Sequence, residues 1–578
     1  MKNEFVSYLN TLHNASGCNE HAIAENNVSE KDCYSRQLKF EREITKRLLE
    51  IITHKEGKVI ILTGHAGDGK TSILQTIVEK CSKKPMAGNE LEGDIILENQ
   101  KHIHYVKDMS EHEREKQIAI VKEAFLAQKN NVTVILISNT GPLFNVLQEL
   151  DIEEEKIIKM LDTKTLEEDL FSIAGVKDVP VLVANLALFD NSDIIEKYIE
   201  KIVNPVLWEP CSQCEKKEYC PIYFNQAVVR KNKEQIVEFS KWYYRWNFEH
   251  GERFTVRQMI AHIAYSFTGN LNCQKVVSLV GNRNLKRKLY QSYSNLFFGY
   301  HYEKGKSIKD KNALQIRPIA LLQKQGLDSK KIPEEYELFV QNKFYVFEKE
   351  IEEIVRLCWK EFAFLGEDKK QEKQECFKVI KRAYYMYHTK GQEENEKIVR
   401  AVFSDVFIKY LKIQNMEQVL GSIKSYIRRL TFQALQLVFT GLAVEETDRI
   451  FLTVKRKGDI PQNVQIVQGY VNRDEIKIDF KNVLNVMNGK IEKVIVLECK
   501  NQKAELTLPM LEYFYEISNG MIQTKIDPRL SQGVENIKAK IFKAGKKTEK
   551  DSITMIYSNG NKFNKVELHV EEEKVFVE

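Results

Sequence analysis

The octapeptide at residues 64–71, GHAGDGKT, constrains the fold of this chain more than any other stretch. It follows the apolar run Val59–Leu62 and precedes Ser72–Glu79, whose composition favours a helix. The pattern G-x-x-x-x-G-K-T between a strand and a helix is the sequence form of a phosphate-binding loop. Glycines let the backbone wrap around a phosphate with its amides pointing inward, and the helix adds the positive end of its dipole. We therefore expect a strand–loop–helix unit that binds a nucleoside triphosphate.

Side-chain chemistry predicts the roles within this loop. Lys70 is expected to reach the β- and γ-phosphates, and Thr71 is expected to offer its hydroxyl to Mg²⁺. The residues predicted to bind ATP are Gly64, His65, Ala66, Gly67, Asp68, Gly69, Lys70, Thr71 and Ser72.

Short apolar runs alternate with helical stretches around this loop. A charged amphipathic helix is expected over Tyr34–Thr53, ahead of the first run. The alternation predicts an α/β core, a parallel sheet with crossover helices. The predicted strands are Lys58–Leu62, His102–Val106, Val132–Ile137 and Val179–Val183.

Polar residues follow two of these strands. Asp108 comes directly after His102–Val106 and is the expected Mg²⁺-organising carboxylate, while Glu111 is expected to position a water. Asn139 follows the next strand and is expected to sense the γ-phosphate between the loop and the Asp108 strand. An ordinary surface acid and a turn-forming asparagine are the alternatives. The predicted catalytic residues are Lys70, Asp108, Glu111 and Asn139.

Three cysteines lie close together in Cys211-x₂-Cys214-x₅-Cys220. The amino terminus lacks a secretory pattern, so these residues are expected to be thiols or metal ligands rather than disulfides. Tetrahedral Zn²⁺ needs four ligands, and Cys273 is the leading fourth, ahead of His262. We expect a structural zinc site, with unpaired buried thiols as the alternative.

The remainder of the chain changes character twice. Residues 330–445 have helical periodicity, and after Asp448 the period becomes two, with helices expected near 509–519 and 532–544. Lys304–Lys311 is expected to be an exposed linker. The predicted domains are 1–205, an NTPase core with an N-terminal helical segment; 206–300, a zinc-bearing helical lid; 301–446, α-helical; and 447–578, β-rich.

Charge and hydropathy limit the partners. The net charge of +5 is small for 578 residues, so contact with DNA would depend on local patches. Two such patches are Arg283–Lys288 and the lysines that follow Arg529, with solvated helix faces as the alternative. No apolar run is long enough to span a membrane, and a cytoplasmic location is expected.

Two further features have competing interpretations. Arg253 or Arg257 could supply transition-state charge, although a solvated arginine at a helix start is more common. Asp479 with Glu498 and Lys500 matches a nuclease pattern of the Asp…Glu-x-Lys type. Alternating Glu and Lys on an edge strand explains the latter equally well, and we favour that explanation.

Taken together, these motifs resemble the DptF ATPases of DNA phosphorothioation-dependent restriction systems. The resemblance covers about the first half of the chain. It is carried by the stretches Gly64–Ser72, Val106–Glu111, Ile137–Leu143, Val181–Leu186, Trp208–Asn225 and Phe254–Cys273.

This resemblance implies a cytoplasmic ATPase that acts beside the partner proteins DptG and DptH against DNA lacking the host's phosphorothioate mark. The expected fold is an AAA- or STAND-like P-loop NTPase core, then a zinc-knuckle helical lid, an α-helical domain and a β-rich C-terminal domain. ATP, Mg²⁺ and Zn²⁺ are the expected cofactors, and ATP state would control assembly or action on DNA. The alternative is a nucleotide-binding scaffold or STAND-type switch of another antiviral system that recruits a nuclease. Homo-oligomerisation stays open.

Overall fold

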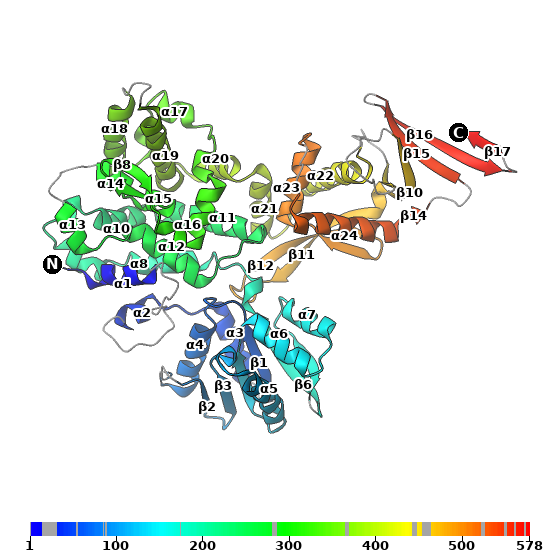
Figure 1. Ribbon diagram of the computed structural model, residues 1–578, viewed down its shortest axis with the longest axis horizontal. Helices are drawn as coiled ribbons and strands as arrows, with labels where there is room; N and C mark the ends of the chain where they lie inside the picture. Colours follow the sequence, from blue (N-terminus) through cyan, green and yellow to red (C-terminus); the bar gives the residue numbers. More distant parts are fainter. Residues whose placement is uncertain are drawn as a thin grey trace. The chain divides into compact units, whose positions relative to one another are not determined.

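In a computed structural model, the chain forms two compact units (Figure 1). The first comprises Met1–Val402 with Leu484–Lys490, and the second comprises Phe403–Val483 with Ile491–Glu578. The finer division into four domains stays a prediction. The structure describes residues 2–13, 32–53, 56–84, 86, 90–173, 175–279, 286–363, 369–441, 448–453, 464–521, 526–547, 552–559, 562–571 and 574–577.

A six-stranded sheet forms the base of the first unit, in the order β2-β3-β4-β1-β6-β5. Its four inner strands are parallel, as the alternating pattern predicts, whereas both edge strands are antiparallel to their neighbours. The fold is therefore mixed α/β. The strands are β1 (Val59–Thr63), β2 (Glu92–Ile96), β3 (His102–Val106), β4 (Thr133–Ile137), β5 (Glu168–Ile173) and β6 (Val176–Asn185).

Two apolar layers sandwich this sheet. Successive side chains of a strand point to opposite faces, so Ile61 packs in one layer and Ile60 and Leu62 pack in the other. Helices α3 and α4 supply the layer around Ile60, and α5, α6 and α7 supply the opposite one (Figure 1). These helices are α3 (Glu43–Thr53), α4 (Lys70–Ser82), α5 (Arg114–Lys129), α6 (Thr140–Glu149) and α7 (Glu154–Leu161).

The rest of the first unit is mainly helical. Its central helix is α12 (Val256–Thr268), which is buried from Met259 through Thr268 and begins with a capping box between Thr255 and Gln258. The other helices are α1 (Glu4–Leu12), α2 (Asp32–Leu38), α8 (Ile194–Ile202), α9 (Glu209–Ser212), α10 (Pro221–Lys231), α11 (Lys233–Glu249), α13 (Cys273–Leu279), α14 (Lys286–Tyr290), α15 (Tyr293–Phe297), α16 (Arg317–Gln325), α17 (Glu335–Phe339), α18 (Lys349–Ala363), α19 (Lys370–Tyr387) and α20 (Gln392–Val402).

Two local predictions in this unit were wrong. The expected single helix over Tyr34–Thr53 is broken, because α2 ends at Leu38 and α3 begins at Glu43. The intervening Arg42 side chain instead bonds the carbonyl of Asp68. The expected linker at Lys304–Lys311 contains the turn and second strand of a hairpin, β7 (Tyr300–Glu303) with β8 (Lys306–Lys309).

The second unit carries the β-rich C-terminal region that the change of period predicts. One sheet has the order β14-β10-β15-β16-β17, with β9 also paired to β10, and a second has the order β11-β12-β13. The elements are α21 (Asp405–Asn415), α22 (Gly421–Thr440), β9 (Arg449–Thr453), β10 (Val464–Asn472), β11 (Ile476–Leu484), β12 (Ile491–Cys499), β13 (Gln502–Glu505), α23 (Leu508–Ser518), α24 (Pro528–Ala544), β14 (Lys546–Lys547), β15 (Ser552–Asn559), β16 (Lys562–Glu571) and β17 (Lys574–Val577). Within the described ranges, no helix combines the length and apolar character that crossing a membrane requires.

Candidate nucleotide-binding site

The glycine loop lies at the carboxyl end of β1, beside a cavity of about 290 Å³. Loop residues from Ala66 to Ser72 line it, together with Asp108, Glu111 and Asn139. The sequence-predicted polar residues are thus gathered at one place. An opposing wall of apolar side chains, which the sequence did not indicate, comprises Leu12, Leu38, Phe40, Ile194, Val256 and Ile260.

The loop is a tight turn that glycine makes feasible. Gly67 has a φ of +88° and Gly69 a φ of +86°, in the left-handed region that side chains disfavour. A Cβ on Gly67 would also meet the Cβ of Arg257 at 2.9 Å. The carboxylate of Asp68 closes the turn by accepting a hydrogen bond from the backbone N–H of His65 at 2.8 Å.

Lys70, the first residue of α4, is buried within this turn. Its ammonium donates to the carbonyls of Gly64 and His65 at 3.1 and 3.0 Å and to Asn139 Oδ1 at 2.8 Å. Burial lowers the pKa of Lys70, while the carboxylates of Asp68 and Asp108 act in the opposite direction. A buried ammonium at the N-terminus of a helix is well suited to binding phosphate.

The carboxyl ends of β3 and β4 are tied together beside Lys70. Asp108 caps a 3₁₀ turn by accepting from the backbone N–H of Ser110 at 2.9 Å. The hydroxyl of Ser110 in turn accepts from the backbone N–H of Asn139 at 2.9 Å. Glu111 lines the cavity with its side chain exposed. Sequence reasoning missed Ser110, although its place two residues after the predicted carboxylate was a usable signal.

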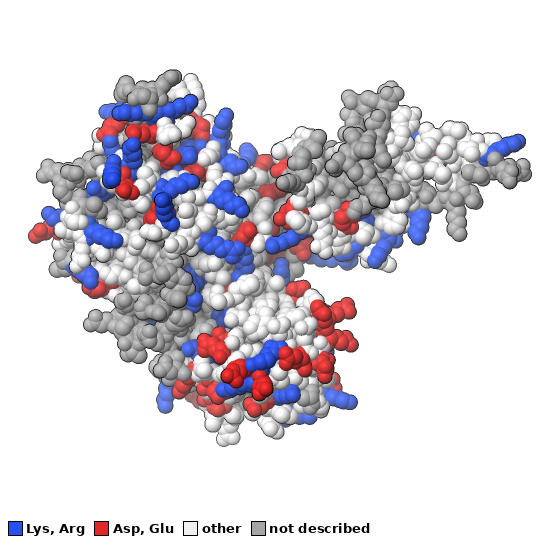
Figure 2. Space-filling view, in the orientation of Figure 1, with Lys and Arg blue, Asp and Glu red and all other residues white. Residues whose placement is uncertain are grey.

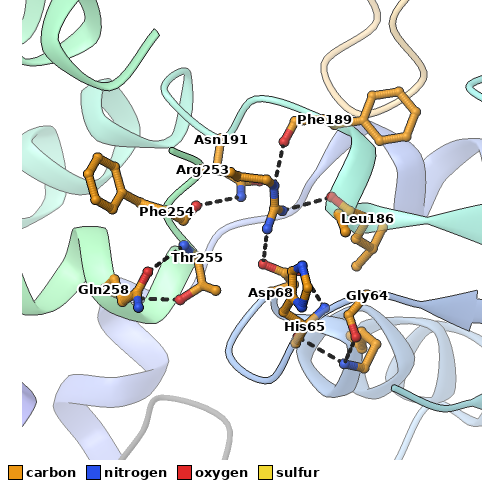
Figure 3. Close-up of polar contacts among 12 residues, drawn as sticks. Gly64, His65, Asp68, Leu186, Phe189, Asn191, Arg253, Phe254, Thr255 and Gln258 are labelled. Carbon is orange, nitrogen blue, oxygen red and sulfur yellow. Dashed lines mark hydrogen bonds and ion pairs between the residues drawn. The ribbon is translucent and has the colours of Figure 1, made fainter. Parts of the chain in front are cut away.

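The two arginines before and within α12 are placed differently. Arg253 is paired with Asp68, with Nη1 2.8 Å from the carboxylate (Figure 3), and its side chain is directed to Asp68 rather than into the cavity. Arg257 lines the cavity, and its backbone N–H donates to the carbonyl of Gly67 at 3.1 Å. Of the two, Arg257 is therefore the one placed to meet a ligand in the cavity.

Two of the four predicted zinc ligands, Cys211 and Cys273, lie beside Asn3. Asn3 donates its backbone N–H to Cys273 Sγ at 3.5 Å and its side-chain amide to Cys211 Sγ at 3.2 Å. Burial raises the pKa of Cys220 to about 11. The runner-up ligand, His262, lies in the helical core, where Tyr244 and the carbonyl of Phe297 contact its ring nitrogens at 2.7 and 2.8 Å. Within the described ranges, no three or more His, Cys, Asp or Glu side chains are grouped so as to hold a metal ion.

The described basic residues of the first predicted patch, Lys286, Arg287 and Lys288, contact other side chains of the protein. Residues Arg283–Leu285 of this patch lie outside the described residues. Lys286 is paired with Glu361, Arg287 lies over the ring of Tyr302, and Lys288 lies 5.3 Å from the ring centroid of Phe224.

The second basic patch is more open. Basic side chains are visible along α24 in Figure 2. Lys538 lies over the ring of Phe439, and the half-buried Lys540 donates to the carbonyl of Lys503 at 2.8 Å, whereas Lys543 is exposed. This helix therefore keeps the basic surface that contact with DNA would need.

The glutamate and lysine of the nuclease-like pattern are each engaged in other contacts. Glu498 is paired with Lys481 and Lys503 at 3.2 and 3.0 Å, and these two lysines lower its pKa. Lys500 donates to the carbonyl of Ala544 at 2.8 Å. The edge-strand explanation was wrong for Glu498, because β12 is the middle strand of its sheet; its charge is instead balanced by Lys481 on β11 and Lys503 on β13.

No family model matches this chain, and no curated protein or solved structure does either.

Proposed function

We propose that this chain is an Mg²⁺-dependent ATPase with a P-loop NTPase core of the AAA or STAND type. The observation that carries the proposal is the placement of Lys70 between the glycine loop and Asn139, with Asp108 and Glu111 in the same cavity. The apolar wall that includes Phe40 fits the base of a nucleotide.

Each of these groups has a distinct role in the proposed reaction. Lys70 would exchange the carbonyls of Gly64 and His65 for the β- and γ-phosphate oxygens, and Asn139 would contact the γ-phosphate. Glu111, exposed to the cavity, would orient the attacking water and accept its proton. Stabilisation of charge on the transferred phosphoryl group supplies most of the catalysis in this reaction class.

Thr71 and Asp108 would hold Mg²⁺. Both line the cavity and present hard oxygen atoms. Mg²⁺ usually takes only one or two protein carboxylates and completes its shell with phosphates and water, so a larger protein ligand set is not required. The ion supplies neutralisation of the phosphate charge when it is bound.

For the cellular role, we propose the component of a DNA phosphorothioation-dependent restriction complex that the motif resemblance implies, in the cytoplasm and beside DptG- and DptH-like partners. Support comes from the motifs themselves and from the exposed Lys543 at the end of α24, which could contact DNA phosphates. The rival is a nucleotide-binding scaffold that recruits a nuclease.

Zn²⁺ at Cys211, Cys214, Cys220 and Cys273 is proposed as a structural cofactor. Support comes from Asn3, which donates hydrogen bonds to both Cys211 and Cys273 and so places two of the four thiols near each other. Metal analysis of protein purified without added zinc tests it. About one zinc per chain is expected, falling to background in Cys211→Ser, and a metal-free wild type would reject the site.

Steady-state ATP hydrolysis by the purified chain tests the main proposal. It is measured without DNA, with unmodified duplex and with phosphorothioated duplex, each beside Lys70→Ala. Turnover that disappears in the variant and changes with DNA is the expected result. Tight ATP binding without turnover, with and without the partner proteins, would favour the scaffold instead.

A further inference from the structure

A negative charge sits inside the loop that is proposed to bind phosphate. The side chain of Asp68 is fully buried, and its Oδ2 closes the turn onto His65. A carboxylate near bound phosphates is unfavourable unless a cation neutralises it, because like charges repel strongly where water is excluded. The sequence motif leaves this position free, so the charge calls for a local explanation.

Arg253 supplies the neutralising charge from another segment of the chain. Nη1 donates to Asp68 Oδ1 at 2.8 Å, and the guanidinium is only 12% exposed. Its remaining edges are used as well, since Nε donates to the carbonyl of Phe189 at 3.0 Å and Nη2 to that of Leu186 at 2.7 Å. The planar guanidinium of Arg253 therefore links the glycine loop and the segment after β6 to the start of α12 (Figure 3).

A second arginine, Arg42, also contacts Asp68. Arg42 Nη1 donates to the backbone carbonyl of Asp68 and Nη2 to Asn191 Oδ1, both at 2.9 Å. Asn191 reaches on to the carbonyl of Phe254 at 3.4 Å, next to Arg253 (Figure 3). The loop is thus held at the Asp68 side chain by one arginine and at the Asp68 carbonyl by the other.

We propose that Arg253 is a positioning residue of the nucleotide site, which neutralises Asp68 and fixes the glycine loop to the start of α12. This inference rests on the proposed nucleotide-binding function. The fixed start of α12 carries Arg257, whose backbone N–H bonds Gly67. In this proposal Arg253 acts through its ion pair with Asp68 and not by contacting a phosphate.

Three variants should differ in nucleotide affinity in a defined order. Arg253→Gln removes the direct ion pair of the buried Asp68 carboxylate, which Arg42 and Lys70 also attract, so the Kd for an ADP analogue should rise by about 30-fold or more. Asp68→Asn keeps an oxygen that can accept from His65 and removes the charge, so the Kd should rise by less than about 5-fold. The double variant should bind more tightly than Arg253→Gln alone.

Fluorescent ADP titration measures these constants, with Lys70→Met as the variant that tests nucleotide binding itself. Arg382→Gln is the matched control, because Arg382 is likewise buried and pairs with Asp328, neither of which contacts the loop or its two arginines. Its Kd should equal that of the wild type. Equal weakness of Arg253→Gln and the double variant would overturn the neutralising role, as would an unchanged Kd in Arg253→Gln.

Hydrogen exchange of the peptide containing residues 64–72 separates this inference from the function on which it rests. Without nucleotide, the loop amides should exchange faster in Arg253→Gln than in the wild type or Arg382→Gln. Unchanged exchange would overturn the inference even if ATP binds. A wild type that binds no nucleotide would remove the proposed function, while faster exchange would still show that Arg253 fixes the loop.

Discussion

Replacing Lys70 with methionine should separate nucleotide binding from folding. The ammonium gains three hydrogen bonds but bears the cost of burial, which lowers its pKa. Hydrogen bonds to charged groups contribute about 1.5–3 kcal/mol each, and burying an ion costs several kcal/mol, so the two nearly cancel. Methionine fills a similar volume, and water in the cavity can reach the freed acceptors. We expect the unfolding free energy to change by less than about 1 kcal/mol.

Binding should respond quite differently. A lysine contact shared by two phosphates is worth about 3 kcal/mol, so the Kd for ATP should rise roughly 150-fold. Isothermal titration gives the Kd, and thermal unfolding of the same samples gives the stability. Lys80→Met on the same helix is the control, since Lys80 is exposed and pairs with Glu41 outside the cavity. Equal ATP affinity in Lys70→Met and the control would refute the phosphate-binding role, and a Tm loss above about 5 °C would show that Lys70 is structural.

Glu111→Gln should lower kcat for ATP by about 10²-fold or more while leaving the Kd near the wild-type value, and unchanged turnover would exclude Glu111 as the base. Gly67→Ala should destabilise the protein by about 1–3 kcal/mol and weaken ATP binding, because the added Cβ meets Arg257 at a φ of +88°; Gly141→Ala, with no atom within 4 Å, should not. The hydrogen bond to Asp310 raises the pKa of His301, so its stabilisation is present below pH 6.5 and lost as the pH rises through the raised value. Asp310→Asn should remove about 1 kcal/mol of this pH-dependent stability, and identical pH profiles of Tm would contradict the pairing.

The parts of the site that the sequence predicts are those encoded by short segments. The strand, glycine loop and helix around Lys70 are contiguous, and Asp108 and Asn139 each follow a strand directly. Apolar runs locate such strands, and polar residues at their ends then fall at one edge of a parallel sheet. The edge strands β2 (Glu92–Ile96) and β5 (Glu168–Ile173) were not predicted, because strands that are exposed on one side carry few apolar residues.

The missing parts depend on contacts between distant segments. Helical periodicity continues through Phe40 and Arg42, yet the helix breaks there because Arg42 bonds the carbonyl of Asp68 and Phe40 lines the cavity. Arg253 lies 185 residues from Asp68 along the chain, and a lone arginine before a helix has no pattern that reveals its partner. Pairings of this kind are set by tertiary packing.

The strand order explains why Asn139 lies where it does. The next sheet strands after the loop along the chain are β2 and β3, but β4 is the strand inserted between β3 and β1. The residue that follows β4 is therefore placed between Lys70, after β1, and Asp108, after β3. Ser110 fixes that placement by accepting from the backbone N–H of Asn139, which leaves its side-chain oxygen directed to Lys70. A change at Asn139 should thus disturb Lys70 first, and the fold of β4, which is buried along its whole length, hardly at all.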